Sequence, residues 1–201
     1  MTWGKRLFDI GLGLLLLPIL GTLILVVLVT LIFTEGRPYF YVAERMKSPT
    51  ESFGLIKFRT MTVAAADKGV SGGDKAARIT RIGRILRRTR GDELPQLWNI
   101  FKGDLSFVGP RAPLREYVER FPEVYAEVLK SRPGATGLAS LYYHAHEEWL
   151  LARCTTPEET DRVYCTRCIP AKARLDLLYQ RHRSVCFDAV LVWRTIRRVL
   201  G

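Results

Sequence analysis

Two adjacent acids, Asp92 and Glu93, lie in a part of the chain that is rich in cations. Magnesium is bound in proteins through one or two carboxylates together with substrate phosphates, and arginine binds phosphate oxygens in a bidentate manner. A carboxylate can also attack phosphorus and form an acyl phosphate. We therefore predict a phosphoryl-transfer site in which Asp92 and Glu93 act in catalysis and hold Mg²⁺. The predicted phosphate-binding residues are Lys57, Arg59, Arg87 and Arg111.

A simpler interpretation of the same two acids is a helix cap. Aspartate is a favoured N-cap residue, Pro95 suits a first helical turn, and acids there interact favourably with the helix dipole. The local sequence alone leaves both interpretations open. The nearby cations favour the catalytic one, because a cap does not require them.

Three predicted elements position these residues. The segment Phe53–Met61 (FGLIKFRTM) is predicted to be a short strand carrying Lys57 and Arg59. A basic amphipathic helix is expected over Lys75–Arg90, after a glycine-rich loop at 67–74. That helix either packs on its own core with a solvated basic face or lies among lipid headgroups. A helix beginning at Asp92 is expected to end at Gly103.

The remainder of the chain is expected to be mostly α-helical with little β-structure. The expected helices are Leu114–Lys130, Glu147–Arg153, Pro157–Tyr164 and Lys172–Leu200, the last with a bend or break near His182–Ser184. No internal repeat is visible in the sequence. We therefore expect a small domain over residues 35–201.

The N-terminal segment is long and apolar. Ile10–Phe33 contains 24 residues without a charge, which is about 36 Å of helix and enough to cross a bilayer core. The run is too long for a signal peptide, and it lacks a good cleavage site. Lys5 and Arg6 precede it and a basic domain follows it, so the positive-inside rule places both ends in the cytoplasm.

A re-entrant helix satisfies that charge distribution. Pro18 lies inside the apolar run, where a proline removes a hydrogen bond and kinks or breaks a helix. We predict a helix–break–helix over residues 1–34 that enters the cytoplasmic leaflet and returns to the same face. A single tilted span with an indifferent proline is the alternative.

The bulk composition is consistent with phosphate-rich or lipid partners. The 201-residue chain has a formal net charge of +11, from 31 Lys and Arg against 20 Asp and Glu. Such a charge suits anionic lipid, phosphate or nucleic acid alike. Four cysteines show no secreted disulfide pattern, which indicates a reducing compartment. Cys165 and Cys168 form one CxxC, which is weak support for zinc and is better explained by packing.

The motifs resemble one family over nearly the whole chain. DELPQLWNIFKGDLSFVGPR is similar to the signature of the polyprenol-phosphate phosphoglycosyl transferases of the bacterial sugar transferase family. KFRTM, TRIGRILRRTRGDELPQL and RPGATGLAS resemble its central segments. KRLFDIGLGLLLLPIL resembles its membrane entry helix, and the segment from Ile169 to Leu200 resembles its C-terminal portion.

This resemblance implies a specific activity. Small members are monotopic proteins of the bacterial inner membrane that face the cytoplasm. They move a sugar phosphate from a UDP-sugar to a polyprenol phosphate such as undecaprenyl phosphate, release UMP and need Mg²⁺. The resemblance further implies that Asp92 is the nucleophile and that Glu93 helps to hold the site and the metal. Lys57, Arg87 and Arg111 match positions at which the family keeps basic residues near the phosphates.

Some features of the sequence differ from the usual pattern of the family, and two other functions remain as alternatives to the transferase. Leu17-Pro18 replaces a common Ser-Pro, Ala139-Ser140-Leu141 replaces a common AQV, and the segment from Tyr142 to Cys168 is longer than in the shortest relatives. A polyprenyl diphosphate phosphatase would share the acids and cations but use water as the acceptor. A non-enzymatic membrane or nucleic-acid adaptor is suggested by charge alone, and we expect no nucleic-acid partner. The sequence does not identify the sugar or the oligomeric state.

Overall fold

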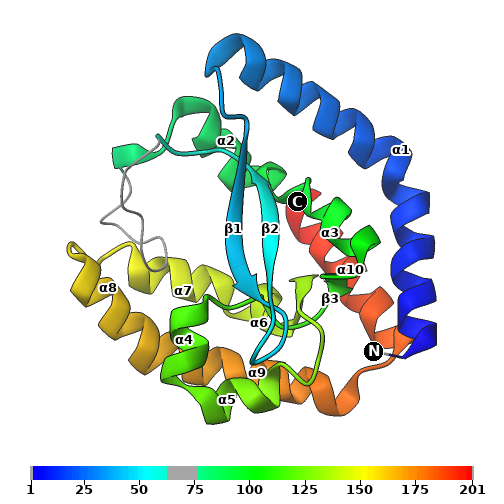
Figure 1. Ribbon diagram of the computed structural model, residues 1–201, viewed down its shortest axis with the longest axis vertical. Helices are drawn as coiled ribbons and strands as arrows, with labels where there is room; N and C mark the ends of the chain where they lie inside the picture. The colour runs from blue at the N-terminus through cyan, green and yellow to red at the C-terminus, as the bar shows by residue number, and fades with distance from the viewer. Residues whose placement is uncertain (1, 63–76, 201) are drawn as a thin grey trace.

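The computed structural model describes residues 2–62 and 77–200, and these are mostly helical, as the sequence predicts. The predicted loop at 67–74 and the first two residues of the predicted basic helix lie outside the described residues. Figure 1 shows a central hairpin and a long N-terminal helix that arches along one side of it. Shorter helices gather at the end of the hairpin where its two strands are connected.

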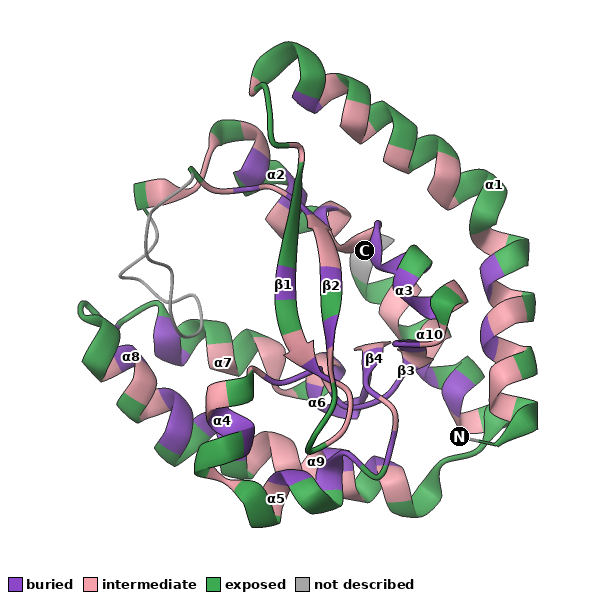
Figure 2. Ribbon diagram, viewed as in Figure 1, coloured by how far each residue is buried: buried purple, intermediate pink, exposed green. Residues whose placement is uncertain are grey.

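The N-terminal helix α1 (Trp3–Thr34) is continuous through Pro18, and Figure 1 shows it as two legs that meet at a bend midway along it. A proline inside a helix removes one hydrogen bond, and the Thr22 hydroxyl donates to the carbonyl of Pro18, a contact that bends helices further. The predicted break is therefore a bend in one unbroken helix. The helix is long enough to cross a membrane, and an 18-residue window within it has a mean hydropathy of 3.0. Figure 2 shows that little of the helix is buried.

The N-terminal end of α1 is bound to the globular part by polar contacts. The Lys5 ammonium lies 2.6 Å from the carboxylate of Asp188, which is almost fully buried. Asp9, also fully buried, accepts hydrogen bonds from the Ser106 hydroxyl and the Phe107 backbone amide. Charged groups buried in this way hold the first turns of α1 against the domain.

The C-terminal end of α1 returns to the same domain. Leu31 is buried in an apolar cluster with Phe58 and Leu86, which belong to the hairpin and to helix α2 (Arg81–Thr89). Since both ends of α1 contact one globular unit, the helix leaves that unit and comes back to it.

Two antiparallel strands form the hairpin, β1 (Phe40–Met46) and β2 (Ser52–Phe58). The predicted strand is confirmed, but it ends at Phe58 rather than Met61, so Arg59 lies just after it. Side chains alternate between the two faces of a strand, so Lys57 lies on the same face as the buried Phe53 and Leu55. This alternation explains why a lysine side chain is mostly buried here.

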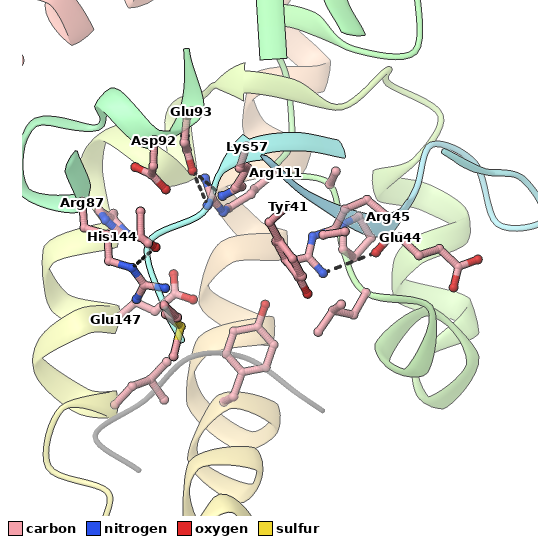
Figure 3. Close-up of a pocket in the computed structure, with 18 of the residues that line it drawn as sticks. Tyr41, Glu44, Arg45, Lys57, Arg87, Asp92, Glu93, Arg111, His144 and Glu147 are labelled. Atoms are coloured by element: carbon pink, nitrogen blue, oxygen red, sulfur yellow. Dashed lines mark hydrogen bonds and ion pairs between the residues drawn. The ribbon is translucent and has the colours of Figure 1, made fainter. Parts of the chain in front are cut away.

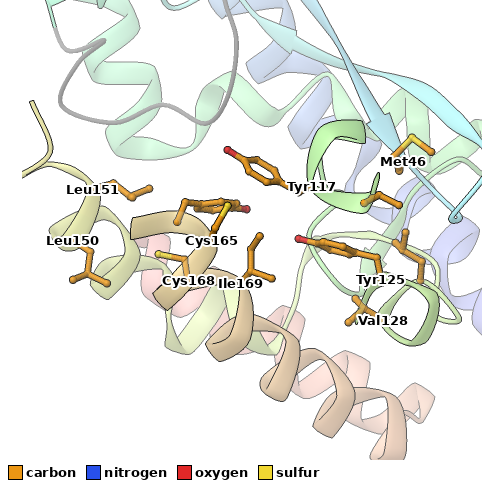
Figure 4. Packing of buried hydrophobic residues seen from close by; sticks show 12 residues of the cluster. Met46, Tyr117, Tyr125, Val128, Leu150, Leu151, Cys165, Cys168 and Ile169 are labelled. Atoms are coloured by element: carbon orange, nitrogen blue, oxygen red, sulfur yellow. The ribbon is translucent and has the colours of Figure 1, made fainter. Parts of the chain in front are cut away.

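The largest core cluster joins β1 to the helices at the end of the hairpin, and Figure 4 shows Tyr117, Tyr125, Cys165 and Cys168 within it. The cysteines of the CxxC pack as apolar residues, and the Cys165 thiol contacts the Asp161 carboxylate at 3.7 Å. The helices of this region are α4 (Arg115–Arg120), α5 (Pro122–Val128), α7 (His144–Leu151), α8 (Pro157–Val163) and α9 (Ile169–His182).

Several predicted helix boundaries need correction. The basic helix expected over Lys75–Arg90 begins as an α-helix only at Arg81. The expected single helix Leu114–Lys130 is divided into α4 and α5, because Pro122 disfavours helical backbone at Phe121, whose φ and ψ are −129° and 57°. The expected helix from Pro157 continues through a π-helical segment, Tyr164–Cys168, into α9. The predicted break near His182–Ser184 is confirmed, since α9 ends at His182 and α10 (Val185–Leu200) begins three residues later.

The RPGATG segment forms a short parallel pair between β3 (Ser106–Val108) and β4 (Gly134–Thr136), followed by α6 (Leu138–Tyr142). A Cβ atom at Gly134 would lie 2.1 Å from the Gly109 nitrogen, so the two segments approach too closely for any side chain there. This contact fixes the Gly109-Pro110 turn and the start of the segment that carries Arg111.

Candidate active site

Asp92 and Glu93 lie in a short 3₁₀ turn, Gly91–Glu93, between α2 and helix α3 (Gln96–Lys102). The predicted end of α3 at Gly103 is confirmed, but its predicted beginning at Asp92 is wrong, and neither acid caps it. Arg90 ends α2 in the left-handed region with a φ of 58°, which is uncommon for a residue other than glycine. This reversal turns the two acids toward a cavity.

Glu93 is the centre of an ion cluster. Its Oε1 atom lies 2.8 Å from both Lys57 Nζ and Arg111 Nη2, and its Oε2 lies 3.4 Å from Arg90 Nη1. Figure 3 shows Lys57 and Arg111 meeting at Glu93. Burial alone would raise the pKa of Glu93, but the charges of Arg111, Lys57 and Arg90 outweigh it and hold that pKa well below its ordinary value. Glu93 is therefore ionised and fixes two cations of the site in place.

Asp92 is buried but makes no hydrogen bond or ion pair within residues 2–62 and 77–200. Burial raises the pKa of Asp92, with Lys57 opposing that shift and Glu93 adding to it. Figure 3 shows its carboxylate beside Glu93 on the side of the cavity where Arg87 lies. A desolvated carboxylate without partners is well suited to react, because no hydrogen bonds stabilise its ground state.

Arg87 and Arg59 have different surroundings. The Arg87 Nε donates to the Thr60 hydroxyl at 2.9 Å, and a Cβ atom at Gly83 would lie 2.2 Å from the Thr60 carbonyl oxygen. Gly83 thus lets α2 approach the end of β2 and bring Arg87 to the cavity. Arg59 donates instead to the carbonyls of Glu35, Gly36 and Arg37 after α1. The structure brings Lys57, Arg87 and Arg111 to the acids. Arg59 also lines the cavity, while its guanidinium braces the end of α1.

The cavity beside these residues has a volume of about 970 Å³, at the upper end of the range for small-molecule sites. Its opposite wall consists of α7, the π-helical segment and α9. The ionisable residues of that wall include His144, Glu147, Tyr164, Lys172 and Asp176. These residues were not predicted from the sequence, because the wall forms only when helices far apart in sequence pack together. The one sequence signal was the extra length of the segment from Tyr142 to Cys168.

The donor set fits a magnesium ion in part. The unpaired Asp92 carboxylate is a suitable oxygen ligand, and Glu93 Oε2 has a single longer contact, with Arg90. Within the described ranges there is no group of three or more acidic, histidine or cysteine side chains that could hold a metal. Magnesium needs no such group when substrate phosphates supply the remaining ligands.

A carboxylate–cation cluster at a large cavity and an apolar helix long enough to cross a bilayer are features expected of an enzyme that acts on phosphorylated substrates at a membrane. The chain belongs to the bacterial sugar transferase family, whose model matches residues 1–201. This finding confirms the resemblance seen in the motifs.

Several relatives match almost all of the chain. It is 33% identical over 196 residues to EpsL of Bacillus subtilis, described as an uncharacterized sugar transferase, covering 98% of this chain and 87% of that protein. It is 31% identical over 212 residues to the exopolysaccharide production protein ExoY of Sinorhizobium fredii, covering 97% and 84%. A UDP-N-acetylgalactosamine-undecaprenyl-phosphate N-acetylgalactosaminephosphotransferase of Aeromonas hydrophila is 28% identical over 202 residues, which cover 98% of this chain but 43% of that protein.

Proposed function

We propose that this protein transfers a sugar 1-phosphate from a UDP-sugar to a polyprenol phosphate such as undecaprenyl phosphate and releases UMP. The observation that carries the proposal is the buried, unpaired carboxylate of Asp92 facing a cavity beside cations that Glu93 holds in place. The name of the Aeromonas relative, which specifies this kind of donor and acceptor, supports it.

In the first step, an Asp92 carboxylate oxygen attacks the phosphorus that bears the sugar. The P–O bond to UMP breaks, UMP leaves with the electron pair, and the sugar phosphate remains on Asp92 as an acyl phosphate. Arg87 and Arg111 line the cavity. In this proposal they bind the diphosphate oxygens. Bound Mg²⁺, held by Asp92 and Glu93 with the phosphates, would neutralise charge on the leaving UMP.

In the second step, a phosphate oxygen of the polyprenol phosphate attacks the same phosphorus. The bond to Asp92 breaks, which returns the carboxylate and forms a polyprenyl diphosphate sugar. A two-step exchange suits this site because one substrate is water-soluble and the other is a lipid, so the two need not occupy the cavity together.

We also propose that α1 is re-entrant and that the domain lies on the cytoplasmic face of the inner membrane. Lys5 and Leu31, near opposite ends of α1, both contact the same globular unit. A straight helix of 32 residues is about 48 Å long, so a full crossing would place its ends on opposite sides of the bilayer. The bend at Pro18 supports a return to one side.

Thiol labelling tests this topology. Cys186 is exposed and reports the side of the domain, and Thr2→Cys in a Cys186→Ser background reports the N-terminus. We expect a membrane-impermeant maleimide to label neither thiol in intact spheroplasts and both after permeabilisation. Labelling of Thr2→Cys alone from outside would show a true crossing. Pro18→Leu should straighten α1 and increase outside labelling at residue 2.

A UMP-release assay tests the activity. Purified protein in lipid nanodiscs is incubated with Mg²⁺, undecaprenyl phosphate and each member of a panel of UDP-sugars. We expect UMP and a lipid-linked product from at least one donor, with product formation dependent on the lipid. Release of inorganic phosphate from a polyprenyl diphosphate, without UMP formation, would favour the phosphatase instead.

A further inference from the structure

The cavity wall opposite Asp92 contains a polar cluster that the proposed transfer steps do not use. Glu147 on α7 forms an ion pair of 2.9 Å with Lys172 on α9. The Lys172 ammonium also donates to the Tyr164 hydroxyl at 3.2 Å. Figure 3 shows Glu147 facing the same cavity as Asp92 and Arg87. The cluster therefore lines the substrate cavity rather than a separate surface.

Asp176 belongs to this wall and lacks a partner. It lies one helical turn after Lys172 on α9, lines the cavity, and is only 6% exposed. Within the described parts of the chain, no group forms a hydrogen bond or ion pair with its carboxylate. Because its carboxylate lines the cavity and has no partner in the described protein, it is available to accept hydrogen bonds from a ligand bound there.

The two sides of the cavity differ in charge. Near Asp92 and Glu93 the cations outnumber the acids, which suits a diphosphate. In the second cluster, Glu147 and Asp176 accompany one ammonium, Lys172, and burial raises the pKa of Asp176 to about 7. The cluster therefore has no excess of positive charge with which to bind phosphate. Hydroxyl groups suit this cluster, since they donate strong, short hydrogen bonds to carboxylates and accept one from an ammonium.

We infer that Glu147, Lys172 and Asp176 bind sugar hydroxyl groups of the nucleotide-sugar donor and discriminate against ligands that lack them. This inference rests on the proposed function. The hydroxyls belong either to the transferred hexose or to the ribose of the nucleotide, and both present the same chemistry. A site built to bond a hydroxyl discriminates strongly against a ligand that lacks it, because its buried polar groups are then left unpaired.

Asp176→Asn and Glu147→Gln test the inference, because both keep the shape of the side chain and remove its charge. The matched control is Glu123→Gln, an exposed acid on α5 outside the cavity. UMP release is measured for the best donor and for its epimers and deoxy analogues, with UMP and 2′-deoxy-UMP as inhibitors. Thermal melting in nanodiscs checks folding for each variant.

We expect Asp176→Asn to lower kcat/KM for the best donor about 10- to 100-fold, the range for hydrogen bonds to a charged group, and to reduce the preference over deoxy analogues. Unchanged inhibition by UMP assigns the hydroxyls to the hexose, whereas an equal loss of UMP affinity assigns them to the ribose. If both cavity variants melt like the control and keep kcat/KM and donor preference within about twofold, the inference is wrong. Failure of the proposed function is distinguishable, since the wild-type protein would then release no UMP with any donor.

Discussion

Replacing Asp92 with Asn is expected to lower transferase turnover by on the order of 10⁴-fold or more, as loss of a catalytic nucleophile does in other enzymes. The amide is isosteric with the carboxylate but cannot attack phosphorus. The same change should raise the free energy of unfolding at neutral pH. Burial raises the pKa of Asp92, so the folded state disfavours its charged form, and the neutral amide avoids that penalty.

UMP-release rates and thermal melting measure the two effects. The matched control is Asp104→Asn, because Asp104 is buried to the same 8% exposure but pairs with Lys47 and Lys102 outside the cavity. The control should keep its turnover. A variant at Asp92 that loses activity only in proportion to a loss of stability would indicate a structural role for the residue.

Replacing Glu93 with Gln should impair both folding and catalysis. The change leaves Lys57 and Arg111 without their counter-ion. Removing one partner of a buried ion pair lowers the free energy of unfolding by about 3 to 5 kcal/mol, and we expect a loss of about 3 kcal/mol because Arg111 is partly exposed. The freed cations would also lose the positions in which they meet phosphate, so we expect turnover to fall by about 100-fold. Chemical denaturation and UMP release measure these effects. Glu119→Gln is the control, since that exposed acid has one contact of 4.0 Å with Arg115 and should contribute little.

The same residue predicts a pH dependence of stability. The folded-state pKa of Glu93 lies below its unfolded value, so its contribution is present above the unfolded value and is lost as pH falls through the folded one. Wild-type stability should therefore decline below about pH 4.3, the ordinary glutamate pKa, more steeply than that of Glu93→Gln. Parallel curves for the two proteins would contradict the assignment of Glu93 as the ionised centre of the cluster.

The sequence predicts which residues gather at the cavity better than it predicts what surrounds them. The acids and the cations Lys57, Arg87 and Arg111 carry a recognisable pattern, and the strand that holds Lys57 follows from its alternation. The sequence does not reveal that Asp92 lies outside a helix cap. The chain reverses at Arg90 through left-handed backbone, and an arginine gives no indication of that conformation. The division of the helix at Phe121 could have been predicted from Pro122.

Other features depend on contacts between distant segments. The anchoring of Lys5 by Asp188 and the bracing of the end of α1 by Arg59 join residues far apart in the chain. The cluster of Glu147, Lys172 and Asp176 is of the same kind, because helix periodicity predicts which face of α9 is buried but not which cavity that face lines. Hydrophobic patterns in the sequence identify helices and strands. Which polar side chains come into contact depends on how those helices and strands pack together.

The central claim is that Asp92 carries the sugar phosphate covalently, and intact-mass spectrometry tests it most directly. The protein is incubated with UDP-sugar and Mg²⁺ in the absence of polyprenol phosphate and then denatured. We predict that the wild-type chain gains the mass of one sugar phosphate, that the adduct disappears when polyprenol phosphate is added, and that Asp92→Asn gains no mass. An adduct on Asp92→Asn, or a wild-type chain that releases UMP and forms lipid-linked product without ever carrying an adduct, would contradict the account.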